Sequence, residues 1–394
     1  RERGAALLLP TDRFFAGCPA HHLTSQRRER LCRNGNPIPG EGLEEGTLYR
    51  VYGQDGTFLC GRGVGGGWLV WGMLFWGASA PRRPRWMPDE RTMPMEESKR
   101  NVIALGFFDG VHLGHQALLR RAAERAEALG MAPAMFTFDR SPREFVTGRP
   151  VPLLTTAEER REKVRTLFPD MEVIVASFDR EMMTMPWVDF VLLLAREYRA
   201  GWLVAGHDYR FGHKNAGTPA LLMKKAAQLG MGCDIIPAVT LDGITVSSTY
   251  IRSLLERGDV EEAARFLGGP FALTGRVRHG RGLGSRLGAP TLNVIPQPEQ
   301  ALPANGVYVT RVLSGERTYG AVTNVGVRPT VEEGGGITVE SHLLDQDLQL
   351  YGSLCRVEFL AHIRPERRFE DLEALRRQIA ADADAARQHF REQT

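Results

Sequence analysis

The sequence predicts three parts: a small β-rich domain, an α/β domain with a doubly wound parallel sheet, and a closed β-barrel followed by a helix. Apolar runs that alternate with helical periods between residues 101 and 268 predict the α/β domain. Short strand-like runs separated by turns, which follow a glycine-rich break at residues 267–270, predict the barrel. At 394 residues, 43% of them hydrophobic and 25% charged, the chain is long enough for two or three globular domains.

Composition limits the classes of function. The net charge of +3 comes from 50 basic and 47 acidic residues, a balance too even to indicate nucleic-acid binding from bulk electrostatics. Five cysteines, odd in number and far apart, suggest neither a disulfide framework nor a zinc site. The strongest apolar run, residues 68–76, is well short of the roughly 20 residues of a membrane helix, and no secretory signal is evident. We therefore expect a cytoplasmic protein.

Residues 1–77 form the predicted β-rich domain. Strand-like runs at 48–52 and 57–60 flank a Gln-Asp-Gly turn, which predicts a hairpin, and residues 24–33 form a basic helix. An Arg-rich helix is also typical of a solvated surface. The order of basic helix, turn at 33–37 and Tyr-Arg-Val-Tyr strand resembles the C-terminal PUA-like RNA-binding domain of tRNA pseudouridine synthase B. That resemblance implies tRNA contact through residues 1–77.

Residues 78–100 are rich in Pro, Arg and Met and have no apolar period, so they are predicted to be a linker. Met93 or Met95 could serve as the start of an independent protein, since both precede the first α/β strand closely. In that case residues 1–77 are a gene-fusion or reading-frame remnant. Both interpretations stay open at this point.

The predicted α/β domain spans residues 101–268. Its expected strands are 101–105, 132–138, 173–176, 202–205 and 233–238, and its expected helices begin at Leu113 or cover 157–167, 187–198 and 219–229. Ligands of such sheets bind at the carboxyl ends of the strands.

The first of these carboxyl ends carries two imidazoles. Gly106 and Gly110 mark a turn after strand 101–105, and His112 and His115 follow where the turn enters a helix, three residues apart and so on one face. Free backbone N–H groups and the positive end of the helix dipole make this a place for phosphate. A histidine pair on a solvated helix, or a half-built metal site, is the simpler alternative.

Two further segments follow predicted strands. In GHDYRFG (206–212), Asp208 and Arg210 can hold ribose or phosphate and place a ring against Phe211, although a plain turn with a buried aromatic also fits. In VSSTYIR (246–252), the hydroxyl residues suit a helix N-cap. With free N–H groups and Arg252, the same cap is an anion cradle.

Together these motifs resemble nucleotidylyltransferases, most closely the bacterial bifunctional enzymes that combine riboflavin kinase with FMN adenylyltransferase. The resemblance implies that His112, His115 and Arg252 stabilise phosphate charge and that Phe211 contacts the flavin. It also implies nucleotide-binding roles for a larger set: Gly106, Phe107, Asp109, Gly110, Gly114, Asp208, Arg210, Ser247, Ser248 and Thr249. FTFDRSP (136–142) resembles the family's F-x-P-H-P segment, but Ser141 replaces the usual His and receives no role.

Residues 269–394 resemble riboflavin kinase over nearly their whole length, through GRVRHGRGLGSRLGAPTLNV, TNVGVRPTV, VESHLLD and IRPERRFEDL. The expected strands are 271–278, 306–313, 318–325, 338–344 and 354–359, with a helix at 368–391. The resemblance implies Mg²⁺ ligation by the hard oxygens of Thr291 and Asn293 and proton acceptance by Glu340, otherwise a salt-bridge residue. It also implies nucleotide binding at Gly280, Gly282 and Gly284, and flavin binding at Arg364.

The sequence thus predicts FAD biosynthesis from riboflavin, with ATP, FMN and Mg²⁺ taking part. One alternative is an adenylyltransferase for pantetheine phosphate or nicotinamide mononucleotide, but those enzymes lack the kinase barrel. Another is an RNA-binding or tRNA-modification protein acting through residues 1–77. A fused chain without enzymatic activity is the third.

Overall fold

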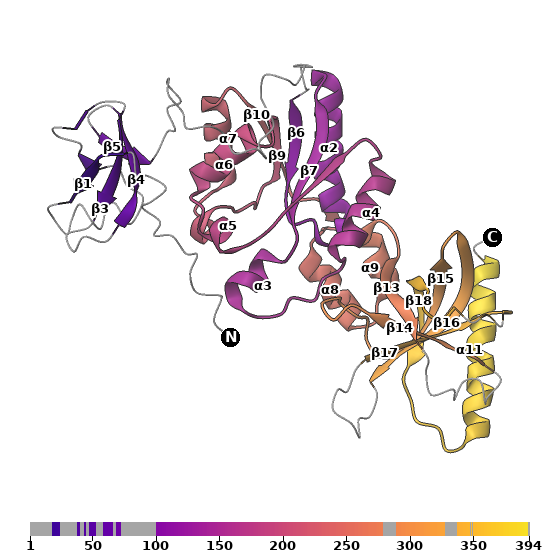
Figure 1. Ribbon diagram of the computed structural model, residues 1–394. Helices are drawn as coiled ribbons and strands as arrows, with labels where there is room; N and C mark the ends of the chain where they lie inside the picture. Colours follow the sequence, from indigo (N-terminus) through magenta and orange to yellow (C-terminus); the bar gives the residue numbers. More distant parts are fainter. Residues whose placement is uncertain are drawn as a thin grey trace, which may run out of the picture. The chain divides into compact units, whose positions relative to one another are not determined.

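The computed structural model describes residues 18–23, 38–39, 43–44, 47–52, 58–65, 68–71, 100–278, 289–327, 337–346, 348 and 350–392. The chain forms two compact units, residues 1–96 and 97–394 (Figure 1). In the described parts of the chain, none of the helices has the length and apolarity that crossing a membrane requires.

The first unit contains a five-stranded sheet with the order β1-β3-β4-β5-β2. Its strands are β1 (Ala20–His22), β2 (Ile38–Pro39), β3 (Leu48–Tyr52), β4 (Phe58–Gly65) and β5 (Trp68–Trp71). β3 and β4 pair antiparallel, as the predicted hairpin requires. The predicted basic helix at 24–33 and the turn at 33–37 lie outside the described residues, so the PUA-like interpretation stays a prediction.

The second unit begins with a five-stranded parallel sheet of order β10-β9-β6-β7-β8, which confirms the doubly wound α/β prediction. Its strands are β6 (Asn101–Leu105), β7 (Ala132–Phe138), β8 (Glu172–Ala176), β9 (Ala200–Gly206) and β10 (Gly232–Ile236). Its main helices are α2 (Leu113–Leu129), α4 (Ala157–Leu167), α6 (Trp187–Arg196) and α7 (Pro219–Gln228). Shorter elements are η2 (Asp109–Val111), α3 (Pro142–Thr147), α5 (Arg180–Thr184) and η3 (His213–Asn215).

Alternation along the central strand explains the layers of this domain. Ile103 and Leu105 of β6 pack with buried residues of α6 and α7, whereas Val102 and Ala104 pack with those of α2 and α4. Because successive strand residues point to opposite faces, a continuously apolar strand buries both sides of the sheet. The chain order reverses at β6, which pairs with β7 on one side and β9 on the other. This switch point is where such sheets bind ligands.

A hairpin of β11 (Thr240–Leu241) and β12 (Ile244–Thr245) leads to α8 (Ser248–Glu256) and α9 (Val260–Leu267). A closed antiparallel barrel follows in the order β13-β14-β17-β16-β15-β18, which confirms the barrel prediction. Its strands are β13 (Phe271–Arg278), β14 (Leu292–Pro296), β15 (Gly306–Ser314), β16 (Arg317–Val327), β17 (Ile337–Leu343) and β18 (Leu354–Pro365). α11 (Leu372–Glu392) packs Ala383 and Ala386 against Val309 of the barrel.

Two details of the barrel differ from the prediction. β14 was not predicted, because its short apolar run follows Pro290-Thr291 and has the sequence of a turn; only pairing with β13 and β17 makes it a strand. The final helix begins at Leu372 rather than at residue 368. The boundary at residue 268 between the α/β domain and the barrel domain stays a prediction, because one hydrophobic core joins α8 and α9 to the barrel.

Candidate active site

A cavity of about 880 Å³ opens at the switch point, beside the carboxyl ends of β6 and β9. Three segments that are far apart in the sequence meet there: the turn into α2, the loop after β9 and the start of α8. Eleven of the predicted residues line it: Gly106, Phe107, His112, Gly114, His115, Asp208, Arg210, Phe211, Ser247, Ser248 and Thr249. The structure thus brings together motifs that lie at residues 106–115, 206–212 and 246–252 of the sequence.

The two histidines stack at the start of α2. Their ring centroids are 3.6 Å apart, and Nδ1 of His112 accepts a hydrogen bond from the backbone N–H of His115 at 3.2 Å, so His112 is the N-cap. A Cβ at Gly114 would lie 3.2 Å from the His112 ring, which explains the glycine. Burial lowers the pKa of His112 to about 3 and that of His115 well below 6.5. Both rings are neutral at physiological pH, so Nε2 of His112 carries the proton and can donate it to a phosphate oxygen.

Asp109, Gly110 and Arg252 do not line the cavity. Asp109 is 3% exposed, pairs with the Arg252 guanidinium and accepts a hydrogen bond from the backbone N–H of Thr155 at 3.1 Å. Burial raises the pKa of Asp109, although the charge of Arg252 opposes this shift. Ser248 Oγ donates to the backbone carbonyl of Asp109 at 3.0 Å. These contacts join the two ends of the predicted phosphate clasp.

The start of α8 combines both roles that its sequence suggested. Ser247 Oγ accepts a hydrogen bond from the backbone N–H of Tyr250 at 3.2 Å, which makes Ser247 the N-cap. Ser247, Ser248 and Thr249 also line the cavity. A capped helix end that opens on a cavity is suited to bind an anion.

The loop after β9 is partly structural. Asp208 and Arg210 are exposed at the cavity, but Phe211 is only 5% exposed and belongs to the core between Phe190 and Tyr209. A Cβ at Gly217 would lie 2.7 Å from the Phe211 ring, so this glycine is needed for the ring to pack. Most of the Phe211 ring is therefore buried in the core, as expected for a turn with a buried aromatic.

The sequence prediction missed the apolar wall of the cavity. α5 and the residue after it contribute Met182, Met183 and Met185. α3 contributes Val146, and the segment after β8 contributes Phe178. The signal that could have revealed this wall is the Met-Met-Thr-Met run on a short amphipathic segment. Ser141, for which no role was predicted, caps α3 by accepting a hydrogen bond from the backbone N–H of Glu144 at 3.3 Å.

The barrel aligns polar residues across three strands. Strand register places Asn293 of β14 opposite Glu340 of β17, and Glu340 opposite Asn324 of β16. Asn293 is only 4% exposed, and Thr291 directly precedes β14. Asn324 was not predicted, because only strand pairing places it in this row. Gly280, Gly282 and Gly284 lie outside the described residues.

Hard oxygen donors of this kind suit Mg²⁺ that also binds phosphates and water. The described ranges contain no cluster of three or more His, Cys, Asp or Glu residues of the kind that binds a metal by itself.

Arg364 holds the final helix in place. Its guanidinium pairs with Asp382 of α11 at 2.8 Å and lies 5.7 Å from the ring centre of Phe369. Asp382 is almost fully buried, so this pair fixes α11 to β18.

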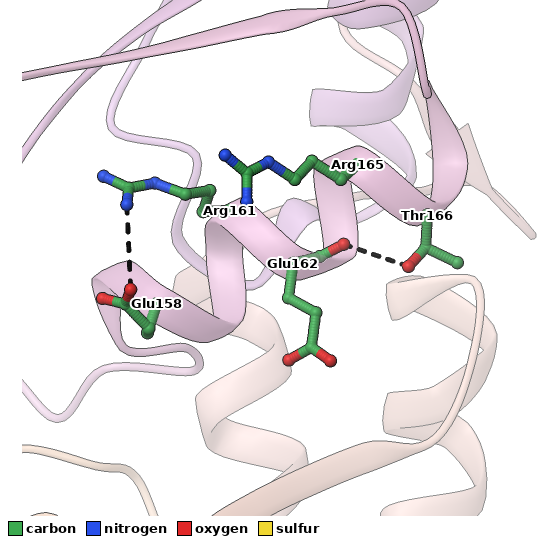
Figure 2. A pocket seen from close by; sticks show the side chains of 5 residues that line it. All are labelled: Glu158, Arg161, Glu162, Arg165 and Thr166. Carbon is green, nitrogen blue, oxygen red and sulfur yellow. Dashed lines mark hydrogen bonds and ion pairs between the residues drawn. The ribbon is translucent and has the colours of Figure 1, made fainter. Parts of the chain in front are cut away.

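A hollow of about 420 Å³ on the outer face of α4 is a surface feature (Figure 2). All five lining residues come from that one helix: Glu158, Arg161, Glu162, Arg165 and Thr166. Arg161 pairs with Glu158 at 3.7 Å, an ordinary i,i+3 contact.

Family comparisons agree with this arrangement. The FAD synthetase family model matches residues 94–250, and the riboflavin kinase family model matches residues 267–390. The bifunctional riboflavin kinase/FMN adenylyltransferase of Pseudomonas fluorescens is 36% identical over 292 residues, which cover 74% of this chain and 93% of that protein. The protein of the same description from Escherichia coli K12 is 36% identical over 294 residues, 73% of this chain and 92% of the relative.

The fold and the two matched regions define a nucleotidyl-transfer domain joined to a kinase barrel. The chain belongs to the family of bifunctional riboflavin kinase/FMN adenylyltransferases. Among solved structures, one titled a macrolide-efflux protein from Streptococcus pneumoniae has a TM-score of 0.67 and 29% identity, and the match covers 73% of this chain and 94% of that chain.

Proposed function

We propose that this chain converts riboflavin to FAD in two ATP-dependent steps at two separate sites. The barrel phosphorylates riboflavin to FMN, and the α/β cavity adenylylates FMN. The observation that carries the second step is the meeting of the stacked imidazoles and the capped start of α8 at one cavity. Membership of the family supports both steps.

In the adenylylation step, a phosphate oxygen of FMN attacks the α-phosphorus of ATP. The bond from that phosphorus to the bridging oxygen breaks, and pyrophosphate leaves with the electron pair. His112, His115 and the N-terminus of α8 stabilise the charge on the phosphates, so no covalent enzyme intermediate is needed. Asp109 acts indirectly, because it holds Arg252 under the same site. Asp208 and Arg210 remain proposed nucleotide contacts.

The apolar wall of this cavity suits the flavin ring of FMN. Met182, Met185 and Phe178 offer a polarisable surface for an aromatic ring. The direct flavin contacts predicted for Phe211 and Arg364 stay predictions, and the core packing of Phe211 and the Asp382 pair of Arg364 limit what either can contribute.

In the barrel, Glu340 accepts the proton of the terminal ribityl hydroxyl as that oxygen attacks the γ-phosphorus of ATP, and ADP leaves. Thr291 and Asn293 would hold Mg²⁺, which neutralises phosphate charge when bound. Asn324, in register with Glu340, is a further polar neighbour. The nucleotide-binding roles of Gly280, Gly282 and Gly284 stay predictions.

Two variants test the division of labour. Glu340→Gln should abolish FMN formation from riboflavin, while added FMN is still converted to FAD. His115→Ala should still produce FMN. Its rate of FAD formation should fall by roughly two orders of magnitude, the usual effect of losing one donor that stabilises the transition state. Both products are measured by chromatography with riboflavin, ATP and Mg²⁺ present.

Glu358→Gln is a matched control, since Glu358 is a barrel carboxylate that pairs with Arg311 and Arg356. It should leave both reactions intact. Loss of both activities in either of the two site variants would contradict the proposal.

For residues 1–77 we propose contact with tRNA, supported by the resemblance to a PUA-like domain and by the β3–β4 hairpin. A gel-shift assay with tRNA, with and without residues 1–77, tests this. We also propose a cytoplasmic location, which the free thiols of Cys18, Cys233 and Cys355 support.

A further inference from the structure

Arg160 of α4 is one of the most deeply buried side chains in the α/β domain, with 1% of its surface exposed. Its Nη1 donates to Thr137 Oγ1 at 2.9 Å and to the backbone carbonyl of Phe138 at 3.1 Å. The guanidinium carbon lies 4.2 Å from the ring centre of Phe107, a cation–π contact. Thr137 Oγ1 in turn donates to the backbone carbonyl of Phe107 at 2.8 Å. Arg160 therefore contacts the ring of Phe107 directly and holds its main chain through Thr137. Phe107 is a residue of the cavity wall.

Two of the three guanidinium nitrogens have no hydrogen-bond partner in the described parts of the chain. Nε and Nη2 of Arg160 are buried without a hydrogen-bond partner among the residues that the structure describes. Burial lowers the pKa of Arg160 to about 10, so the group still carries its charge at neutral pH. A buried cation with unsatisfied donors is costly, and an apolar side chain of similar volume is often tolerated at least as well. Packing alone therefore does not explain an arginine here.

Charge is also unbalanced around this side chain. The positive charge of Arg160 acts on Asp109 and on His115, but Asp109 is already paired with Arg252. Lys163, one turn further along α4, donates to the backbone carbonyl of Gly110 at 2.9 Å. The buried carboxylate of Glu159 is turned toward Thr156 and Gln300. The guanidinium groups of Arg160 and Arg252 thus share the Asp109 carboxylate, while the Lys163 ammonium donates to backbone carbonyls.

We propose that Arg160 is a positioning residue of the adenylyl-transfer site. It fixes Phe107 in the cavity wall and places a positive charge near His115 that Asp109, already paired with Arg252, balances only in part. The polyphosphate of the substrate supplies the remaining negative charge. Arg160 does not itself line the cavity, so it acts through Phe107 and His115 and not by touching the substrate. The inference rests on the proposed function, because it needs a polyphosphate at this cavity.

Four variants separate the charge of Arg160 from its packing. Arg160→Met keeps an apolar stem and removes the charge. Arg160→Gln removes the charge but can still donate a hydrogen bond to Thr137. If the Arg160→Met protein does not fold, Arg160→Gln takes its place in the comparison. Arg160→Lys keeps the charge. Arg161→Met is the matched control, since Arg161 is the neighbouring arginine on the outer face of the same helix.

For each variant, kcat and KM for FMN adenylylation, the rate of riboflavin phosphorylation and the urea midpoint are measured. We expect the Met and Gln variants to lose roughly tenfold or more in kcat for adenylylation, with KM for FMN and the kinase rate unchanged. Arg160→Lys should recover most of that loss, and Arg161→Met should match the wild type.

Wild-type adenylylation rates in the neutral variants would overturn the proposal, and so would an Arg160→Lys variant as slow as Arg160→Met. A merely structural role predicts instead that adenylylation falls only as far as the folded fraction does. If the wild-type protein makes FMN but no FAD, the proposed function of the cavity fails, which is a distinct result.

Discussion

At the residue scale, His112 caps α2 and lines the cavity with the same ring. Nδ1 can accept the hydrogen bond from the backbone N–H of His115 only while it carries no proton. Burial and the nearby charge of Lys163 disfavour a second proton and hold the pKa at about 3. The cap, the neutral charge state and the Nε2–H donor are therefore linked in one side chain.

This linkage predicts a loss of stability in acid. Between pH 6.5 and about 3, His112 binds a proton in the unfolded chain but not in the folded protein, so the free energy of unfolding falls as the pH falls. The contribution is about 1.4 kcal/mol per pH unit, or about 2 kcal/mol from pH 6.5 to pH 5. Urea unfolding at pH 7 and pH 5 measures it.

His112→Asn is the matched variant, because asparagine is also a good N-cap and does not titrate. Its stability should fall less between pH 7 and pH 5 than that of the wild type. Equal losses in the two proteins would show that the His112 pKa is not depressed in the folded state.

At the element scale, the segment before α4 connects the phosphate turn to the barrel. Thr155 Oγ1 accepts a hydrogen bond from the backbone N–H of Gly110 at 2.9 Å, and Thr156 forms a capping box with Glu159. Glu159 also accepts two hydrogen bonds from Gln300, while Leu153 forms a β-bridge with the same glutamine. The start of α4 is thus fixed by the barrel and in turn fixes the turn at Gly110.

Thr156→Ala should lower the free energy of unfolding by about 1 kcal/mol, the usual loss for an N-cap. It should also slow FAD formation, because loss of the cap leaves the adjacent Thr155 less firmly placed. Thr155 accepts the hydrogen bond from the backbone N–H of Gly110. Urea unfolding and the adenylylation rate are measured together. Thr218→Ala removes the N-cap of α7 and should cost similar stability without slowing FAD formation; an equal slowing in both variants would argue against the connection.

At the scale of the whole molecule, the two compact units differ in what they carry. The second unit, residues 97–394, contains the cavity, the barrel and nearly all of both family matches. The first contains the five-stranded sheet of β1 to β5. Neither catalytic step as proposed here uses a residue of the first unit.

A chain of residues 97–394 should therefore make FMN and FAD at rates within about twofold of the full chain, because a compact unit with its own core folds by itself. Steady-state rates for both steps, normalised to folded protein, measure this. A large loss of either activity with an unchanged urea midpoint would assign residues 1–96 a part in catalysis.

Local patterns were enough to predict much of the fold and of the site. The parallel sheet, the barrel and the strand–turn–helix at His112 were predicted correctly, because strand and helix periods repeat within a few residues. β14 was missed, since its strand character depends on pairing with β13 and β17. The apolar wall of methionines was also missed, because apolar residues on a short helix look the same in a core as in a cavity.

The sequence by itself determined the class of fold, the position of the imidazoles at a helix start, and the family. Only the tertiary structure decided which charged groups meet. Asp109 and Arg252 are 143 residues apart in the chain, and Arg160 of α4 contacts the ring of Phe107 in the turn after β6. Helix and strand patterns depend on neighbours along the backbone, whereas burial and ion pairing depend on how distant elements pack. For that reason the pairing of Asp109 with Arg252 and of Arg364 with Asp382 was not predicted from the sequence.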